Sequence, residues 1–192
     1  MVIVGPEEPL VKVIVNFLEK NKIKVFGPNR YASRLEGLKY LMKSICKKYN
    51  IPTAKFLVCK NKIELRNSIN KFNLQVVVKA DGLAEGKGVV ICKTKKRAIE
   101  VSKEIFKGKF KSSKKVVIEE FLEREEASYF LIVDNKSFIN FGTAQDHKKV
   151  YDNDIGPNTG GMGCFTPSKL VNKILEEKIY TKIIKKTFNG LK

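Results

Sequence analysis

Two lysines flank a glycine-rich stretch in residues 75–88, which read QVVVKADGLAEGKG. Lys79 ends a run of β-branched residues, and Lys87 lies near the end of the glycine-rich part. Backbone N–H groups can approach an anion closely where there is no Cβ, and ammonium groups neutralise its charge. The pattern therefore predicts a strand and a loop that together cover a polyphosphate, as in a nucleotide site.

This stretch differs from the two commonest phosphate-binding motifs. A Walker loop has four residues between its glycines and Ser or Thr after its lysine. Here three residues separate Gly82 from Gly86, and Gly88 follows the lysine. The dinucleotide fingerprint opens a helix, whereas residues 89–93 are typical of a strand. An ordinary hairpin turn with a solvated lysine is the alternative reading.

An acidic segment, residues 118–128, reads IEEFLEREEAS. It begins within the predicted strand 116–121, and the strand end at residues 119–122 could hold an adenine ring. A backbone carbonyl there would accept from the exocyclic amine, and a backbone N–H would donate to a ring nitrogen. Glu126 could reach the ribose hydroxyls. The alternative is that these carboxylates only balance nearby lysines.

Residues 144–167, AQDHKKVYDNDIGPNTGGMGCFTP, combine charged groups with a TGGMG turn. Asp146 and Asp154 could bind an ammonium group, and Lys148 and Lys149 a phosphate. Backbone amides in such a turn can form an anion-binding nest. A structureless segment of this length inside a compact domain is usually functional.

The net charge of +18 would ordinarily indicate a nucleic-acid partner. However, the basic residues are spread along the chain with acidic residues between them, and AT-rich codons favour Lys, Asn and Ile. A solvated lysine-rich surface is therefore the preferred interpretation, and we expect no specific nucleic-acid binding, although anionic ligands should be favoured. A basic nucleic-acid binder stays an alternative, without an aromatic stacking strip to support it.

The four cysteines form no C-x-x-C pair, and His147 is the only histidine, so their spacing predicts free thiols and no zinc site. A lone histidine is more often structural than catalytic. The first residues lack the features of a signal peptide, and no apolar run is long enough to span a bilayer. These features predict a cytoplasmic protein that does not contact a membrane.

Hydrophobic periodicity and turn residues predict the elements that must position these groups. The predicted strands are 2–4, 23–26, 54–59, 75–80, 89–93, 116–121, 128–133 and 137–142. The predicted helical regions are 9–20, 29–49, 62–73, 95–107 and a region from about 167 to the end. Residues 143–165 are predicted to be a long loop. The order of elements predicts a short parallel α/β piece followed by a mixed α+β domain.

The motifs resemble those of a known family. The segments LEGLKYLMK, VVVKADGLAEGKGVV, VIEEFLEREEAS and QDHKKVYDNDIGPNTGGMG occur in the order seen in phosphoribosylamine–glycine ligases, which are ATP-grasp enzymes of purine synthesis. The opening IVGPEEPLV also resembles the end of that family's N-terminal domain. The resemblance covers essentially the whole chain. It implies that residues 1–41 are the tail of a parallel α/β domain and residues 42–192 an incomplete ATP-grasp domain.

The resemblance implies ligation of glycine to 5-phosphoribosylamine, using ATP and Mg²⁺, with Mn²⁺ as a substitute. The implied ATP-binding residues are Lys39, Lys79, Gly86, Lys87, Gly88, Glu119, Glu120, Phe121, Leu122 and Glu126. The implied substrate-binding residues are Glu7, Asp146, His147, Lys148, Asn158, Thr159, Gly160, Gly161 and Met162. The family's metal-binding Glu and Asn lie on strands beyond Lys192, so this chain alone is expected to be inactive, and the full-length protein a monomer.

The chain departs from the family pattern at four positions. Lys149 replaces an arginine, which removes a bidentate fork for phosphate or carboxylate. Tyr151 replaces a glycine, and Leu38 and Glu85 replace smaller residues. A non-catalytic nucleotide-binding remnant of such a ligase is therefore the alternative function.

Overall fold

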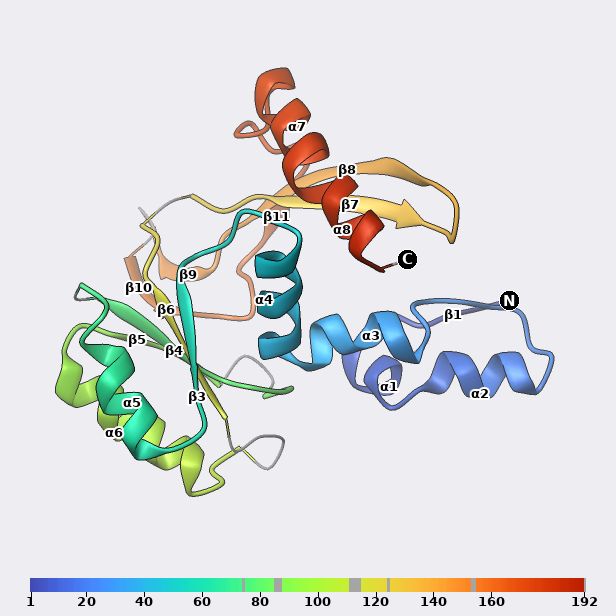
Figure 1. Ribbon diagram of the computed structural model, residues 1–192. Helices are drawn as coiled ribbons and strands as arrows, with labels where there is room; N and C mark the ends of the chain where they lie inside the picture. The colour runs from blue at the N-terminus through green and yellow to red at the C-terminus, as the bar shows by residue number, and fades with distance from the viewer. Residues whose placement is uncertain (74, 85–87, 111–114, 124, 153–154, 192) are drawn as a thin grey trace. The chain divides into compact units, whose positions relative to one another are not determined.

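The computed structural model describes residues 1–73, 75–84, 88–110, 115–123, 125–152 and 155–191. They form two compact units (Figure 1). Unit 1 comprises Met1–Leu122 together with Leu191, and unit 2 comprises Glu123–Gly190. The chain mixes helices with sheets, which confirms the predicted α/β and α+β character.

The first two strands of unit 1, β1 (Val2–Ile3) and β2 (Val25–Phe26), pair in parallel, as the strand–helix–strand pattern predicted. The prediction of one helix over residues 9–20 is wrong. The structure has α1 (Glu7–Val11) and α2 (Ile14–Lys20), separated where Val13 adopts a φ of 64°. A left-handed conformation is rare for a β-branched residue, so periodicity alone gives no sign of this break.

The helical region predicted at 29–49 is also divided in two. Helix α3 (Arg30–Gly37) is capped by Asn29, whose side chain accepts hydrogen bonds from the backbone amides of Tyr31 and Ala32. Leu38 is extended, with φ −136° and ψ 97°, and α4 (Lys39–Lys48) starts directly after it. This extended residue interrupts the helical conformation, so α3 and α4 are separate helices.

Four antiparallel strands form the main sheet of unit 1. Their order is β3 (Phe56–Cys59), β6 (Val116–Glu120), β4 (Val76–Ala80) and β5 (Val89–Cys92). Helices α5 (Lys62–Ile69) and α6 (Lys95–Phe106) cover one face (Figure 1). The core between them holds Cys59, Leu65, Ile69, Val76, Val78, Ala80, Cys92, Ala98, Val101, Ile105, Val116 and Ile118.

The alternation of side chains along a strand decides what lies on the other face of this sheet. Val76, Val78 and Ala80 face the helices, so the lysine between Val78 and Ala80 points away from them. In the pairing of β4 with β6, Val77 lies opposite Glu119 and Lys79 lies opposite Val117. Lys79 and Glu119 are therefore diagonal neighbours on one face.

Unit 2 is built on a hairpin of β7 (Ser128–Val133) and β8 (Phe138–Asp146). As predicted, the turn falls at Asp134, whose carboxylate accepts from the backbone amides of Lys136 and Ser137. These hydrogen bonds hold the pKa of the Asp134 carboxyl below its ordinary value.

The prediction of a loop over residues 143–165 is wrong for much of its length. Strand β8 continues to Asp146, and β11 (Cys164–Phe165) pairs with its end. Between them, β9 (Lys149–Tyr151) pairs with β10 (Ile155–Asn158). The segment is rich in Gly, Asn and Asp, so composition hid its strands.

The last helices are α7 (Lys173–Ile179), the π-helical η1 (Tyr180–Ile184) and α8 (Lys185–Leu191). They pack on β8 through Phe138, whose ring centroid lies 5.6 Å from that of Tyr180 and 5.2 Å from that of Phe188. Among the described residues, every helix is too short or too polar to be a candidate for spanning a bilayer.

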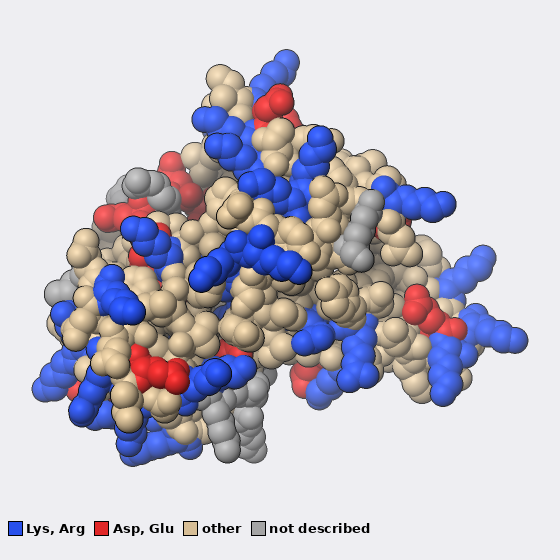
Figure 2. Space-filling model, viewed as in Figure 1, with Lys and Arg blue, Asp and Glu red and all other residues tan. Residues whose placement is uncertain are grey.

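Charged side chains cover much of the surface. Figure 2 shows Lys and Arg scattered over the visible face, with Asp and Glu between them, which agrees with a solvated lysine-rich surface. The cysteines are free: Cys46, Cys59 and Cys92 are buried and Cys164 is exposed. The predicted free thiols are thus confirmed.

Candidate functional site

A buried carboxylate and two ammonium groups lie on the face of the main sheet opposite α5 and α6. The Nζ atoms of Lys79 and Lys43 both lie 3.0 Å from Oε2 of Glu119. The Glu119 and Lys43 side chains are 6% and 4% exposed, and that of Lys79 is 26% exposed. A buried charge needs a counter-charge, and this cluster holds two cations on one anion. Its surplus positive charge and the exposed side of Lys79 favour an anionic ligand.

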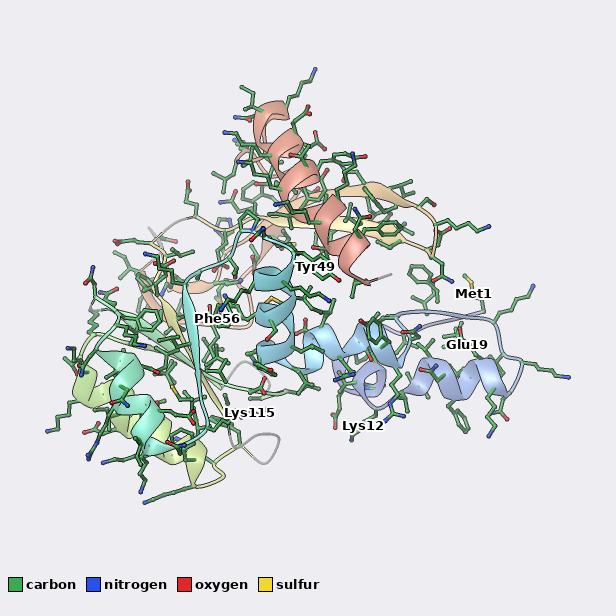
Figure 3. All side chains as sticks on the ribbon, viewed as in Figure 1. Met1, Lys12, Glu19, Tyr49, Phe56 and Lys115 are labelled. Atoms are coloured by element: carbon green, nitrogen blue, oxygen red, sulfur yellow. The ribbon has the colours of Figure 1, made fainter. Side chains whose placement is uncertain are left out.

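Lys43 is a member of this cluster that the sequence analysis missed. It lies on α4, donates to Oγ1 of Thr53 at 2.6 Å, and has its Nζ 5.6 Å from the ring centroid of Phe56. Phe56, on β3, is labelled in Figure 3. The sequence places Lys43 on the lysine-rich side of the helix, and only its spacing of four from Lys39 indicates that it shares a face with a predicted site residue.

Lys39 lies at the start of α4 and donates to the backbone carbonyl of Gly82 at 2.7 Å. The turn at residues 81–82 is thereby tied to the helix, and the buried carboxylate of Asp81 accepts from the Tyr40 amide at 2.9 Å. Burial lowers the pKa of Lys39, and the nearby carboxylates Glu36, Asp81 and Glu119 partly offset this effect. Lys39 is therefore held close to the glycine-rich stretch, as its predicted role requires.

The glycine-rich stretch begins and ends against β4. The Ala80 amide donates to the Gly88 carbonyl at 2.8 Å, and a Cβ on Gly88 would lie 2.6 Å from the Cβ of Ala84. Only glycine fits at that close approach. Gly86 and Lys87 lie outside the described residues.

The strand end predicted to hold adenine is partly engaged already. Glu120 accepts at Oε1 from the Lys55 amide at 2.7 Å, and its own amide donates to the Lys55 carbonyl at 3.0 Å. Its side chain thus holds the segment before β3. Phe121 is half-buried and Leu122 is 57% exposed.

A second group of predicted site residues gathers in unit 2, where the turn after β10 folds back on the end of β8. The Thr159 amide donates to the Lys148 carbonyl at 2.7 Å, and the Met162 amide donates to the His147 carbonyl at 2.7 Å. Gly161 has a φ of 130° and donates its amide to Oγ1 of Thr159 at 3.0 Å. Together with Asn158, which ends β10, and Gly160, these residues form one loop cluster.

Those hydrogen bonds correct one expectation. The amides of Thr159, Gly161 and Met162 donate within the loop, so the TGGMG turn does not present them to an anion as a nest. Charged side chains beside the turn can still bind a charged ligand. The Nζ atom of Lys148 lies 2.6 Å from Oε2 of Glu126 and 3.9 Å from Oδ2 of Asp146. The hydrogen bond with Glu126 raises the pKa of Lys148.

The remaining predicted residues make fewer contacts, and one departure from the family pattern meets an unexpected neighbour. Glu7 is exposed at the start of α1, in unit 1. His147 is exposed and its ring centroid lies 5.7 Å from that of Phe165. Tyr151, which departs from the family pattern, lies over Gly156: a Cβ there would approach the tyrosine ring to 2.7 Å. A glycine five residues later thus leaves room for the larger side chain.

Metal ligands are the part of the site that the described residues do not supply. No three His, Cys, Asp or Glu side chains gather there in a way that could hold an ion. A groove of about 850 Å³ lies in unit 1 between α4 and residues 53–58, lined by the lysines 47, 48 and 55 among others; it borders the cluster at Thr53 and Phe56, which contact Lys43. Its lining includes none of the predicted site residues.

Comparisons with known proteins agree with this arrangement. The family model for the phosphoribosylglycinamide synthetase N domain matches residues 1–36, and the model for that enzyme's ATP-grasp (A) domain matches residues 37–192. A chloroplastic phosphoribosylamine–glycine ligase from Arabidopsis thaliana is 46% identical over all of this chain and 36% of its own length.

Two solved structures share the fold. The crystal structure of phosphoribosylamine–glycine ligase from Thermotoga maritima has a TM-score of 0.84 and 36% identity, over 98% of this chain and 46% of that one. The biotin carboxylase domain of 2-oxoglutarate carboxylase from Hydrogenobacter thermophilus has a TM-score of 0.79, over 98% of this chain and 42% of that one, but at 17% identity it shows the fold alone. This chain thus spans less than half the length of these relatives.

The two family models together cover every residue of the chain, and the buried Lys–Glu–Lys cluster and the loop cluster lie within the ATP-grasp match. The chain belongs to the phosphoribosylglycinamide synthetase family.

Proposed function

We propose that this chain carries the nucleotide-binding part of a ligase that joins glycine to 5-phosphoribosylamine. ATP would phosphorylate the glycine carboxylate, and the amine of phosphoribosylamine would displace phosphate from glycyl phosphate. The products are glycinamide ribonucleotide, ADP and phosphate, in de novo purine synthesis. Family membership supports the reaction, and the shared face of Lys79 and Glu119 is the observation that supports the nucleotide site.

The ATP phosphates are assigned to the lysines around the glycine-rich stretch. Lys39 is tied to Gly82, and Lys79 extends from the same strand that leads into the stretch. Phosphoryl transfer depends mainly on positioning and charge neutralisation, which such ammonium groups supply. Gly86, Lys87 and Gly88 are proposed to cover the phosphates.

The adenosine part is assigned to the end of β6 and the residues after it. Oε1 of Glu119 is buried and has no hydrogen-bond partner among the described residues. An unpaired buried acceptor is unfavourable, and the exocyclic amine of adenine would satisfy it. Glu120, Phe121 and Leu122 complete the adenine site in this proposal, and Glu126 binds ribose.

Glycine and phosphoribosylamine are assigned to the charged residues of the loop cluster. Asp146 and Lys148 provide an anion and a cation side by side, which suits substrates that carry an amine and a carboxylate or phosphate. The full proposed set is Glu7, Asp146, His147, Lys148, Asn158, Thr159, Gly160, Gly161 and Met162. Because the amides of Thr159, Gly161 and Met162 already donate to acceptors of this chain, we assign substrate charge to side chains and not to a backbone nest.

Family enzymes use ATP with a divalent metal, and the Hydrogenobacter structure was solved with MgADP. The described residues do not fit a metal site of three or more ligands. As the family resemblance implies, we propose that Mg²⁺, with Mn²⁺ as a substitute, is held by residues outside these 192, and that these 192 residues alone do not turn over.

ATP titration of the chain by calorimetry tests the nucleotide site. We expect wild type to bind and Lys79→Ala to bind at least about tenfold more weakly, since a charged hydrogen bond contributes about 1.5–3 kcal/mol. Lys12→Ala is the matched control, because Lys12 is exposed directly after α1, outside the cluster. Equal binding by wild type and Lys79→Ala would contradict the assignment, and ADP release that requires both substrates would contradict the inactivity.

The domain boundary is placed after residue 41, close to the junction of the two family models at residues 36 and 37. The whole enzyme is proposed to be a monomer in the cytosol or an equivalent compartment; the Arabidopsis relative is named as chloroplastic. No specific nucleic-acid partner is proposed.

A further inference from the structure

The two oxygens of the Glu119 carboxylate have different environments. Oε2 receives both ammonium groups at 3.0 Å, from Lys43 and Lys79. Oε1 is buried and has no hydrogen-bond partner among the described residues. The carboxylate is therefore held by one oxygen, and the other is a buried acceptor that a donor group of a ligand would satisfy.

Lys43 is the more firmly held of the two cations. Its side chain is 4% exposed, compared with 26% for Lys79. The Thr53 hydroxyl accepts from its Nζ at 2.6 Å, and the Ala54 carbonyl lies 3.5 Å away. Its three ammonium protons thus have fixed acceptors, whereas Lys79 can turn toward a phosphate. When it does so, Lys43 remains as the counter-charge of Glu119.

We propose that Lys43 is a positioning residue that sets the preference of the nucleotide site for adenine over guanine. By anchoring Oε2, it fixes the orientation of the Glu119 carboxylate and leaves Oε1 as an acceptor for the amino group on the base. Guanine presents a carbonyl oxygen where adenine presents that amine, so two acceptors would face each other. The inference rests on the proposed nucleotide site.

The test compares ATP and GTP titrations of the 192-residue chain with those of Lys43→Met. Methionine keeps much of the length and volume of the side chain but removes its charge. We expect the ratio of ATP to GTP affinity to fall by roughly tenfold, as for a buried acceptor that loses its orientation. Lys47→Met, one turn further along the same helix, is the control and should leave the ratio unchanged.

A second variant covers the case in which Lys43→Met does not fold. Thr53→Val removes only the hydroxyl that fixes the ammonium group, and should lower the same ratio by a few-fold. A merely structural role for Lys43 would weaken ATP and GTP binding equally. An unchanged ratio of ATP to GTP affinity in both variants would overturn the inference. If Lys43→Met does not fold, an unchanged ratio in Thr53→Val alone would overturn it. A wild-type chain that binds neither nucleotide would overturn the proposed function as well, whereas a wild type that prefers ATP with unaffected variants would overturn this inference only.

Discussion

Replacing Glu119 with glutamine should destabilise unit 1 far more than an ordinary surface change would. The amide keeps the shape of the side chain but leaves the ammonium groups of Lys43 and Lys79, each 3.0 Å away, without an anion. The Lys43 side chain is 4% exposed, so water cannot replace the lost partner. Breaking a buried ion pair from one side costs about 3–5 kcal/mol, a large part of the ~5–15 kcal/mol that stabilises a typical domain.

Urea unfolding measures this loss. With a denaturant dependence of about 2 kcal/mol per molar urea, a loss of about 4 kcal/mol lowers the midpoint by about 2 M. Far-UV circular dichroism follows the transition, and hydrogen exchange of peptides from β4 and β6 assigns it to unit 1. The exchange rates of the β7–β8 peptides in unit 2 should not change.

Glu8→Gln is the matched control for this experiment. Glu8 also lies close to a lysine, with 2.6 Å between its Oε1 and Lys12 Nζ, but the two side chains are 66% and 72% exposed. Exposed pairs contribute little to stability, so this variant should unfold with wild type. If Glu119→Gln also kept the wild-type midpoint, the buried cluster would not hold β4, β6 and α4 together, and the reasoning would be refuted.

Three further predictions concern single groups. Burial and the hydrogen bond to Glu176 raise the pKa of Tyr129 to about 12, so this tyrosine should ionise late when absorbance at 295 nm is followed against pH. Tyr129→Phe should abolish that late step. Because the folded pKa is raised, the stability that Tyr129 contributes is complete below pH ~10 and is lost as the pH rises through the folded value. With a disulfide-exchange reagent, the exposed thiol of Cys164 should react fast, and the buried thiols of Cys46, Cys59 and Cys92 should react slowly because burial raises their pKa. Four equal reaction rates would contradict the fold. In Glu126→Gln, the raised pKa of Lys148 should fall toward its ordinary value, as an NMR titration between pH 9 and 12 would show. The stability that this ion pair contributes should be present below the pKa of the unfolded chain and lost as the pH rises through the pKa of the folded chain. An unchanged titration would show that the pair does not form.

Much of unit 1 could be predicted from the sequence, because its strands obey simple rules. The β-branched runs at 76–80 and 116–120 form central strands, and the alternation within them places Lys79 and Glu119 on one face. Lys43 could not be found in the same way. Its partner is 76 residues later in the chain, and the pairing depends on how α4 meets the sheet, which no local pattern encodes.

The wrong predictions also have local causes. The break at Val13 places a β-branched residue in a conformation that its type disfavours, so neither propensity nor hydrophobic periodicity predicts it. The strands at 149–151 and 155–158 are too short and too rich in turn-forming residues to show a period of two. The turn after them was read correctly as a loop, but which of its amides are satisfied internally depends on the facing segment 147–148.

The main sheet ends on one side at β3, which in the described part of the chain pairs only with β6. An unpaired strand edge can recruit the same edge of another molecule and start aggregation. Here the groove beside β3 is lined by Lys47, Lys48 and Lys55, so two copies that approach edge to edge bring six like charges together. Salt screens that repulsion within about 8 Å at physiological ionic strength. Precipitation of this protein should therefore be promoted by salt more than by concentration, and storage buffers of low ionic strength should keep it dispersed.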